Sequence, residues 1–255
     1  MSDTISSPEL LLIDISNSYT KMASADAAAL TESRATLPTG ELSPTAFSEI
    51  GWAQGASRVV LASVVPEKNA ILQEVFGDRL LVVSHELELG VAIDYPEPQT
   101  IGADRLANAA AAAALHGPPA VVVDFGTAVT FDIISREGAY IGGVIAPGLE
   151  VMTDYMFQRT ALLPKIDLLE PTEIIGKSTK SAMMAGAVHG YRGMIKEILT
   201  EIYDEFGATE GAAGQHPKTI ATGGYAELIS AKLRQIDAVD PDFTLQGLRI
   251  IATLN

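Results

Sequence analysis

The sequence predicts a mixed α/β fold made of two similar halves. The main support is a strand-and-turn pattern that occurs twice, as LLLIDISNSYTK at residues 10–21 and as VVVDFGTAVTFD at residues 121–132. Each copy is an apolar run, typical of a buried strand, that ends in an acid and a small polar turn. Gly117-Pro118-Pro119 breaks the chain between the two copies. We therefore expect one half over residues 1–117 and another over residues 118–255.

The polar positions of the two copies match. They are Asp14, Asn17 and Thr20 in the first copy, and Asp124, Thr127 and Thr130 in the second. An acid at the end of a strand can hold a cation, and a tight turn after it directs backbone N–H groups at phosphate. Two such turns that face each other would form a cleft for a nucleotide.

The first half reads as strands with helices between and after them. Strands are expected over Leu10–Ile15, Ser18–Ala23, Arg58–Val65 and Leu80–Val83, and helices over Phe47–Gly55 and Asp104–Leu115. The last helix, DRLANAAAAAAL, has a high helix propensity. Its small side chains suit tight packing, and they would also let a second helix or a second subunit approach closely.

The second half has the same mixed character. Strands are expected over Ala120–Asp124, Ala128–Ser135, Ala139–Ala146 and Thr219–Thr222, and helices over Glu150–Thr160, Lys180–Glu205 and Tyr225–Leu233. Taken alone, an acid followed by glycine at a strand end is most often a turn former. The glycine pairs at 142–143 and 223–224 suit close approach of a phosphate, so the combination favours a ligand site.

The composition excludes several classes of function. A formal charge of −15 over 255 residues argues against a nucleic-acid or anionic-membrane surface. The absence of cysteine removes disulfides, thiolate chemistry and cysteine-based zinc sites. The start MSDTISSPEL has no leader-like pattern, and no apolar run is long enough to span a bilayer, so a soluble cytoplasmic protein is expected. Gly176-Lys177-Ser178 is not a P-loop, because position 171 is proline where that motif needs glycine.

The segment Ile101-Gly102-Ala103-Asp104-Arg105 opens the alanine-rich helix. Asp104 would be a favourable acid in the first turn of that helix, where it offsets the helix dipole. Asp104 and Arg105 could equally be a general base and an anion clamp. Sequence chemistry alone leaves both interpretations open.

Five motifs together resemble type III pantothenate kinases. They are YPEPQTIGADRLANA (95–109), DFGTAVTFDII (124–134), YIGGVIAPGL (140–149), IGKST (175–179) and ATGGYAELI (221–229). They occur in order over most of the chain, which makes the resemblance specific. It implies the actin-like ATPase (ribonuclease H-like) fold, shared with acetate and sugar kinases and heat-shock protein 70, with a nucleotide cleft between two domains. It also implies a homodimer that phosphorylates pantothenate with ATP in the first step of coenzyme A synthesis.

The resemblance also implies roles for single residues. Asp104 would accept the proton of the pantothenate hydroxyl, Gly102, Ala103 and Arg105 would line the pantothenate pocket, and Tyr95 and Thr179 would complete it. Asp124 would bind a monovalent cation, potassium or ammonium. ATP, which is used with Mg²⁺, would contact Thr127 and the turn formed by Asp14, Ile15, Ser16, Asn17, Ser18, Tyr19, Thr20 and Lys21.

Ser16 departs from the family pattern, which has glycine at this position, and Ser18 stands where threonine is common. A side chain at Ser16 would narrow the access of phosphate or demand an unfavourable backbone conformation. The rival interpretation is a non-catalytic relative that binds nucleotide or pantothenate and acts in regulation.

Overall fold

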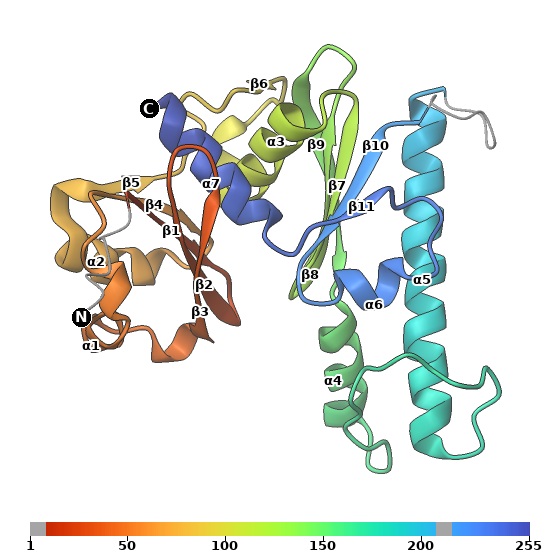
Figure 1. The fold of residues 1–255 in the computed structure, drawn as a ribbon. Helices are drawn as coiled ribbons and strands as arrows, with labels where there is room; N and C mark the ends of the chain where they lie inside the picture. Colours follow the sequence, from red (N-terminus) through yellow and green to blue (C-terminus); the bar gives the residue numbers. More distant parts are fainter. Residues whose placement is uncertain (1–8, 208–215) are drawn as a thin grey trace. The chain divides into compact units, whose positions relative to one another are not determined.

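The computed structural model describes residues 9–207 and 216–255 (Figure 1). Residues 1–8, on which most of the expectation about a leader rests, lie outside this description. The chain divides into two compact units. The first contains residues 1–117, 138–141 and 242–255, and the second contains residues 118–137 and 142–241.

The first unit is built around a five-stranded sheet in the order β3-β2-β1-β4-β5. Its strands are β1 (Leu10–Ile15), β2 (Tyr19–Ala25), β3 (Leu30–Pro38), β4 (Arg58–Ser63) and β5 (Leu80–Val82). All six residues of β1 are buried, as expected of a continuous apolar run in a central strand. The helices α1 (Pro44–Glu49) and α2 (Pro66–Phe76) bring Phe47, Leu72 and Phe76 into one apolar core with this sheet.

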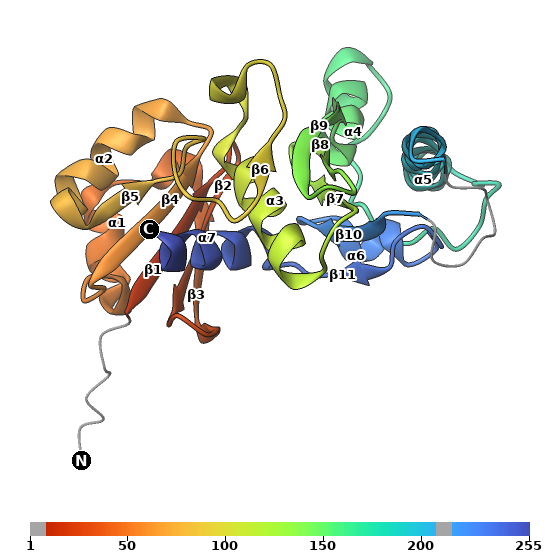
Figure 2. The same ribbon diagram turned by 90° about the horizontal axis from the view of Figure 1, so that it is seen from above.

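Two further helices of the first unit, α3 (Ala103–Leu115) and α7 (Phe243–Leu254), pack tightly against each other (Figure 1, Figure 2). A Cβ atom on Gly247 would lie 1.9 Å from the carbonyl oxygen of Ala107, so only glycine fits at this crossing. The buried Asn108 Oδ1 accepts a hydrogen bond from the Thr244 hydroxyl at 2.9 Å. The alanine-rich face of α3 therefore admits a second helix of the same unit.

The second unit holds the strands β7 (Ala120–Phe125), β8 (Ala128–Ile134), β10 (Lys218–Thr222) and β11 (Ala238–Val239), with most of β9 (Ala139–Pro147). The sheet order is β11-β10-β7-β8-β9-β6, in which β6 (Ala92–Ile93) pairs with the first residues of β9. The helices of this unit are α4 (Leu149–Arg159), α5 (Thr179–Glu205) and α6 (Ala226–Ser230). One apolar core joins the sheet to these helices and includes Phe125, Leu149 and Tyr191.

The two copies of the repeated motif occupy equivalent places. Both β1 and β7 pair with the next strand in antiparallel fashion and with a later strand, β4 or β10, in parallel. The copies diverge after the turn, however. Asp14 lies opposite Lys21, whereas Asp124 lies opposite Thr130, so the first hairpin contains one more residue than the matched spacing predicted.

Several elements differ from the sequence expectations. In place of a helix over 47–55, α1 ends at Glu49 and a 3₁₀ turn follows over Gly51–Ala53. The sequence reading missed β3, β6, β11, α2 and α7. Helix α7 also belongs to the first unit rather than to the second half, because it packs on α3 and β1. Among the described helices, none is long and apolar enough to cross a membrane.

Candidate active site

The first acid turn follows β1 in the first unit. Asp14 is buried, with 7% of its surface exposed, whereas Asn17, Ser18 and Tyr19 are exposed. The turn closes through the N–H of Ser16, which donates to the carbonyl of Tyr19 at 3.1 Å. The backbone of this turn is thus fixed, while its tip is open to a ligand.

Thr39 supports this turn from the segment after β3. Its hydroxyl donates to the carbonyl of Ser16 at 2.7 Å, and its N–H donates to the carbonyl of Ser18 at 3.0 Å. The Thr39 hydroxyl also lies 3.2 Å from the hydroxyl of the buried Thr20. The sequence reading missed Thr39, since nothing in a single sequence links it to a turn more than 20 positions earlier.

The backbone at Ser16 is not strained. Among the described residues, positive φ angles occur only at glycines, so the expectation that Ser16 demands an unfavourable conformation is wrong. The first hairpin is also one residue longer than its counterpart in the second unit. Of the two expected effects of Ser16, only crowding of a phosphate remains.

Asp104 lies in the first turn of α3, in the first unit. Burial raises the pKa of its carboxyl above the ordinary value, and hydrogen bonding and charge from Arg105 partly oppose this shift. The backbone N–H of Arg105 donates to Asp104 Oδ1 at 2.8 Å. A Cβ atom on Gly102 would lie 2.5 Å from the same oxygen, so glycine at 102 leaves space for the carboxylate. A partly buried carboxylate with a raised pKa suits a general base.

Two tyrosines complete this corner of the first unit. The guanidinium of Arg105 lies over the ring of Tyr140, 5.8 Å from its centroid. The ring of Tyr95 meets the same tyrosine edge to face, with the centroids 6.2 Å apart. The structure thus brings Tyr95, Gly102, Ala103, Asp104 and Arg105 into one part of the unit. The buried Tyr140 was missed as a site residue, although it opens one of the motifs.

The second acid turn, in the second unit, is enclosed by glycines. A Cβ atom on Gly223, which has φ +91°, would lie 2.5 Å from Asp124 Oδ1 and 2.7 Å from the N of Phe125. A Cβ atom on Gly148 would lie 2.3 Å from the carbonyl oxygen of Thr127. The chain therefore packs backbone against backbone around this turn. Of the side chains at this turn, the Asp124 carboxylate is the group that could hold a cation, because hard cations prefer oxygen ligands.

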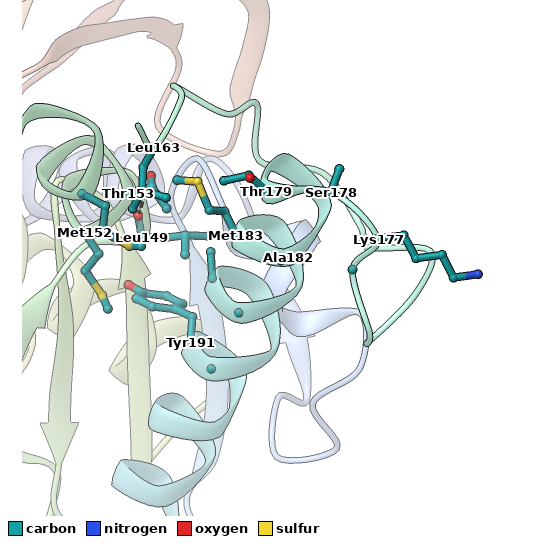
Figure 3. Close-up of a pocket in the computed structure, with 15 residues that line it drawn as sticks. Leu149, Met152, Thr153, Leu163, Lys177, Ser178, Thr179, Ala182, Met183 and Tyr191 are labelled. Atoms are coloured by element: carbon teal, nitrogen blue, oxygen red, sulfur yellow. Dashed lines mark hydrogen bonds between the residues drawn. The ribbon is translucent and has the colours of Figure 1, made fainter. Parts of the chain in front are cut away.

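Thr179 lies in the second unit, at the start of α5. Ser178 caps this helix by accepting a hydrogen bond from the N–H of Ser181 at 3.1 Å. Thr179 borders a cavity of about 770 Å³ whose other walls are largely apolar side chains of α4 and α5, including Met152, Met183 and Tyr191 (Figure 3). Lys177 points away from the cavity, and no strand precedes Gly176, in agreement with the rejection of a P-loop.

The expected site residues therefore form four groups. The turn from Asp14 to Lys21 and the cluster around Asp104 both belong to the first unit. Asp124 and Thr127 lie together in the second unit, in a single turn, and Thr179 lies in the same unit at the cavity of α4 and α5.

Comparisons with known proteins agree on one family. The family model for type III pantothenate kinases matches residues 10–201. The type III pantothenate kinase of Akkermansia muciniphila is 50% identical over 96% of this chain and 98% of its own length, and that of Methylacidiphilum infernorum is 41% identical over 96% and 88%.

Solved structures show the same fold at lower identity. A Baf family protein from Campylobacter jejuni has a TM-score of 0.59 at 20% identity and covers 95% of this chain and 97% of that one. An inorganic polyphosphate/ATP-glucomannokinase from Arthrobacter has a TM-score of 0.50 at 16% identity and covers 97% and 100%. With the two mixed sheets, these similarities confirm the two-domain actin-like fold.

Proposed function

The chain belongs to the type III pantothenate kinase family and is an ATP-dependent pantothenate kinase of coenzyme A synthesis, and we propose that Asp104 is its general base. The observation that carries this proposal is a partly buried carboxylate with a raised pKa at the start of α3, beside Arg105. Because of its partial burial, the Asp104 carboxylate binds a proton more readily than a fully exposed carboxylate does. This suits a group that must accept a proton during the reaction.

In the proposed reaction, the primary hydroxyl of pantothenate attacks the γ-phosphorus of ATP while Asp104 accepts the hydroxyl proton. A new P–O bond forms to pantothenate, the bond between the γ-phosphorus and the bridging oxygen breaks, and ADP leaves. Arg105, which is fixed over the Tyr140 ring, would pair with the carboxylate of pantothenate. Tyr95, Gly102 and Ala103 would line the substrate pocket in the first unit.

We assign the nucleotide to the two acid turns. Residues 14–21 and Thr127 offer backbone N–H groups and hydroxyls of the kind that bind phosphate. A kinase of this type uses ATP with a divalent metal ion, which neutralises charge on the phosphates. Asp124 would hold a monovalent cation, potassium or ammonium, since its carboxylate lies in a cradle of backbone that only glycine at 223 permits.

We propose that the homodimer forms through α4 and α5. The alanine-rich face of α3, considered for a partner subunit in the sequence, is covered by α7. Exposed apolar side chains lie instead on α4 and the segment after it, namely Val151, Met152, Tyr155, Met156, Phe157, Leu162, Ile174 and Ile175. Gly186, Gly190 and Gly193 on α5 have open space where side chains would lie, so a helix of a second copy could approach closely.

Sedimentation of wild type and Leu162→Glu tests this dimer. Leu162 is 89% exposed, so the change should cost little in a monomer and should disrupt a dimer. Val239→Glu, which replaces an exposed apolar residue on β11, is the matched control. A wild-type monomer at assay concentration, or equal effects of both changes, would contradict the proposed face.

Release of ADP in the presence and absence of pantothenate tests the assigned role of Asp104. Wild type should consume ATP only with pantothenate, and Asp104→Asn should lower kcat by about 100-fold or more while ADP still binds. Asp78→Asn, a change at an exposed acid of the same unit, should leave kcat unchanged. Near-normal turnover by Asp104→Asn would refute the assignment, and ADP binding without turnover in wild type would favour the regulatory interpretation.

The cytoplasmic location stays a prediction.

A further inference from the structure

Tyr191 is a buried aromatic residue in the middle of α5, and the reaction proposed above gives it no role. Its side chain is 2% exposed, and its ring packs at a tilt on Phe125, with the centroids 6.3 Å apart. Phe125 directly follows the proposed cation ligand Asp124. The Tyr191 ring therefore packs against the residue that precedes the Gly126-Thr127 turn.

The hydroxyl of Tyr191 contacts the backbone on both sides of Gly148. It donates to the carbonyl of Pro147 at 3.4 Å, and the nearby backbone of Leu149 partly opposes the rise of its pKa. Burial raises the pKa of this hydroxyl above its ordinary range, so it stays protonated at any physiological pH and can donate. Figure 3 shows the ring extending from α5 toward Leu149 and Met152 of α4.

Gly148 itself lies in close backbone contact with Gly126 and Thr127, which form the turn after Asp124. Its N–H donates to the carbonyl of Thr127 at 3.1 Å. A Cβ atom on Gly148 would lie 2.4 Å from the carbonyl oxygen of Gly126, as well as too close to that of Thr127. A shift of the segment from Pro147 to Leu149 would therefore be transmitted directly to Gly126 and Thr127.

We propose that Tyr191 is a positioning residue that fixes the Gly126-Thr127 turn in its nucleotide-binding geometry, by packing on Phe125 and by holding the segment around Gly148. This inference rests on the proposed placement of ATP at Thr127. It assigns a nucleotide-specific role to a side chain of α5 that does not itself reach the turn. All of these contacts lie within the second unit.

A second tyrosine of α5, the partly buried Tyr203, provides a control. The Tyr203 hydroxyl lies 2.6 Å from the Thr219 hydroxyl and donates to the carbonyl of Gln235 at 3.0 Å. Burial raises the pKa of Tyr203 to about 12. Replacing either tyrosine by phenylalanine removes one hydrogen-bonded hydroxyl from the same helix. Only Tyr191 is joined to the acid turn, so Tyr203→Phe controls for the loss of such a hydroxyl elsewhere on α5.

The test compares Tyr191→Phe with Tyr203→Phe in the full chain. Calorimetric titration with ADP measures nucleotide affinity without requiring turnover, and steady-state assays give KM separately for ATP and for pantothenate. We expect Tyr191→Phe to weaken ADP binding and to raise KM for ATP by about 3- to 10-fold, the range set by one hydrogen bond, with KM for pantothenate unchanged. Tyr203→Phe should leave all three values at the wild-type level.

Equal ADP affinity in the two variants, or a parallel rise in both KM values of Tyr191→Phe, would overturn the proposal. Should Tyr191→Phe not fold, Gly148→Ala moves the same turn from its other side and must weaken ADP binding for the inference to stand. If wild type binds ADP but does not phosphorylate pantothenate, the proposed function fails, and the ADP titrations still decide the role of Tyr191.

Discussion

Replacement of Gly223 by alanine tests the glycine cradle around Asp124. The new Cβ would lie 2.5 Å from Asp124 Oδ1 and 2.7 Å from the N of Phe125. The neighbour in the second case is backbone, which cannot rotate away. The backbone of Gly223 also has φ +91°, a conformation that alanine rarely adopts.

Both effects destabilise the fold. Strained backbone costs about 1–3 kcal/mol, and overpacking in a close-packed site costs about 1–3 kcal/mol more. Gly223→Ala should therefore lower the unfolding free energy by about 2–6 kcal/mol. Gly224→Ala is the matched control, since its new Cβ would meet no atom within 4 Å and its φ is not positive.

Urea unfolding followed by circular dichroism measures the stability difference, and ADP release in a potassium titration measures the effect on the site. Because the clash falls on Asp124, the potassium concentration for half-maximal activity should rise in the folded fraction of Gly223→Ala and stay unchanged in Gly224→Ala. Unfolding free energies of the two variants within about 1 kcal/mol of each other would refute the cradle.

Three further changes test the remaining site residues. Asp124→Asn should weaken activation by potassium, and full wild-type activity in sodium-only buffer would contradict a cation at Asp124. Ser16→Gly should lower KM for ATP by up to about 5-fold with kcat unchanged if the side chain crowds phosphate, whereas a higher KM would make Ser16 a ligand. Because burial raises the pKa of Asp104, its contribution favours the fold below the unfolded value of 3.8 and is lost as pH rises through the folded pKa. In urea unfolding, Asp104→Asn should therefore be more stable than wild type at pH 7 and equally stable near pH 3. A lower stability of the variant at pH 7 would contradict this, because it would show that the hydrogen bond and charge of Arg105 outweigh the cost of burying the carboxylate.

The central elements could be predicted because their sequence patterns are nearly uniform. The apolar runs of β1 and β7 indicate strands buried on both faces, and both strands are central in their sheets. The alanine-rich segment became α3 within one residue of its expected start. These elements are determined by local composition, and the family motifs lie at or beside them.

The missed elements depend on distant contacts. β3 is largely polar, LTESRATLP, and is a strand because it adds to the edge of β2. The apolar spacing in FTLQGLRIIATL would have indicated α7 as a helix. Its place in the first unit depends on Gly247 meeting Ala107 about 140 positions earlier in the chain, which no local pattern reveals. The same reason applies to Tyr140 and Gly148, whose neighbours at the site are distant in sequence.

The two acid turns of this chain are held in different ways, which bears on what each tolerates at positions such as Ser16. Around Asp124, the backbone segments at Gly126-Thr127, Gly148 and Gly223 lie in direct contact. Glycine is required at 148 and 223, because a Cβ atom there would collide with backbone atoms of the turn. Around Asp14 the hairpin is one residue longer, no described non-glycine residue has positive φ, and the turn is held by the hydroxyl and the N–H of Thr39. A turn that is held by side-chain hydrogen bonds can accept serine without strain. We therefore expect substitutions in the first turn to change nucleotide affinity without unfolding the protein, and substitutions of the glycines around the second turn to change stability and affinity together.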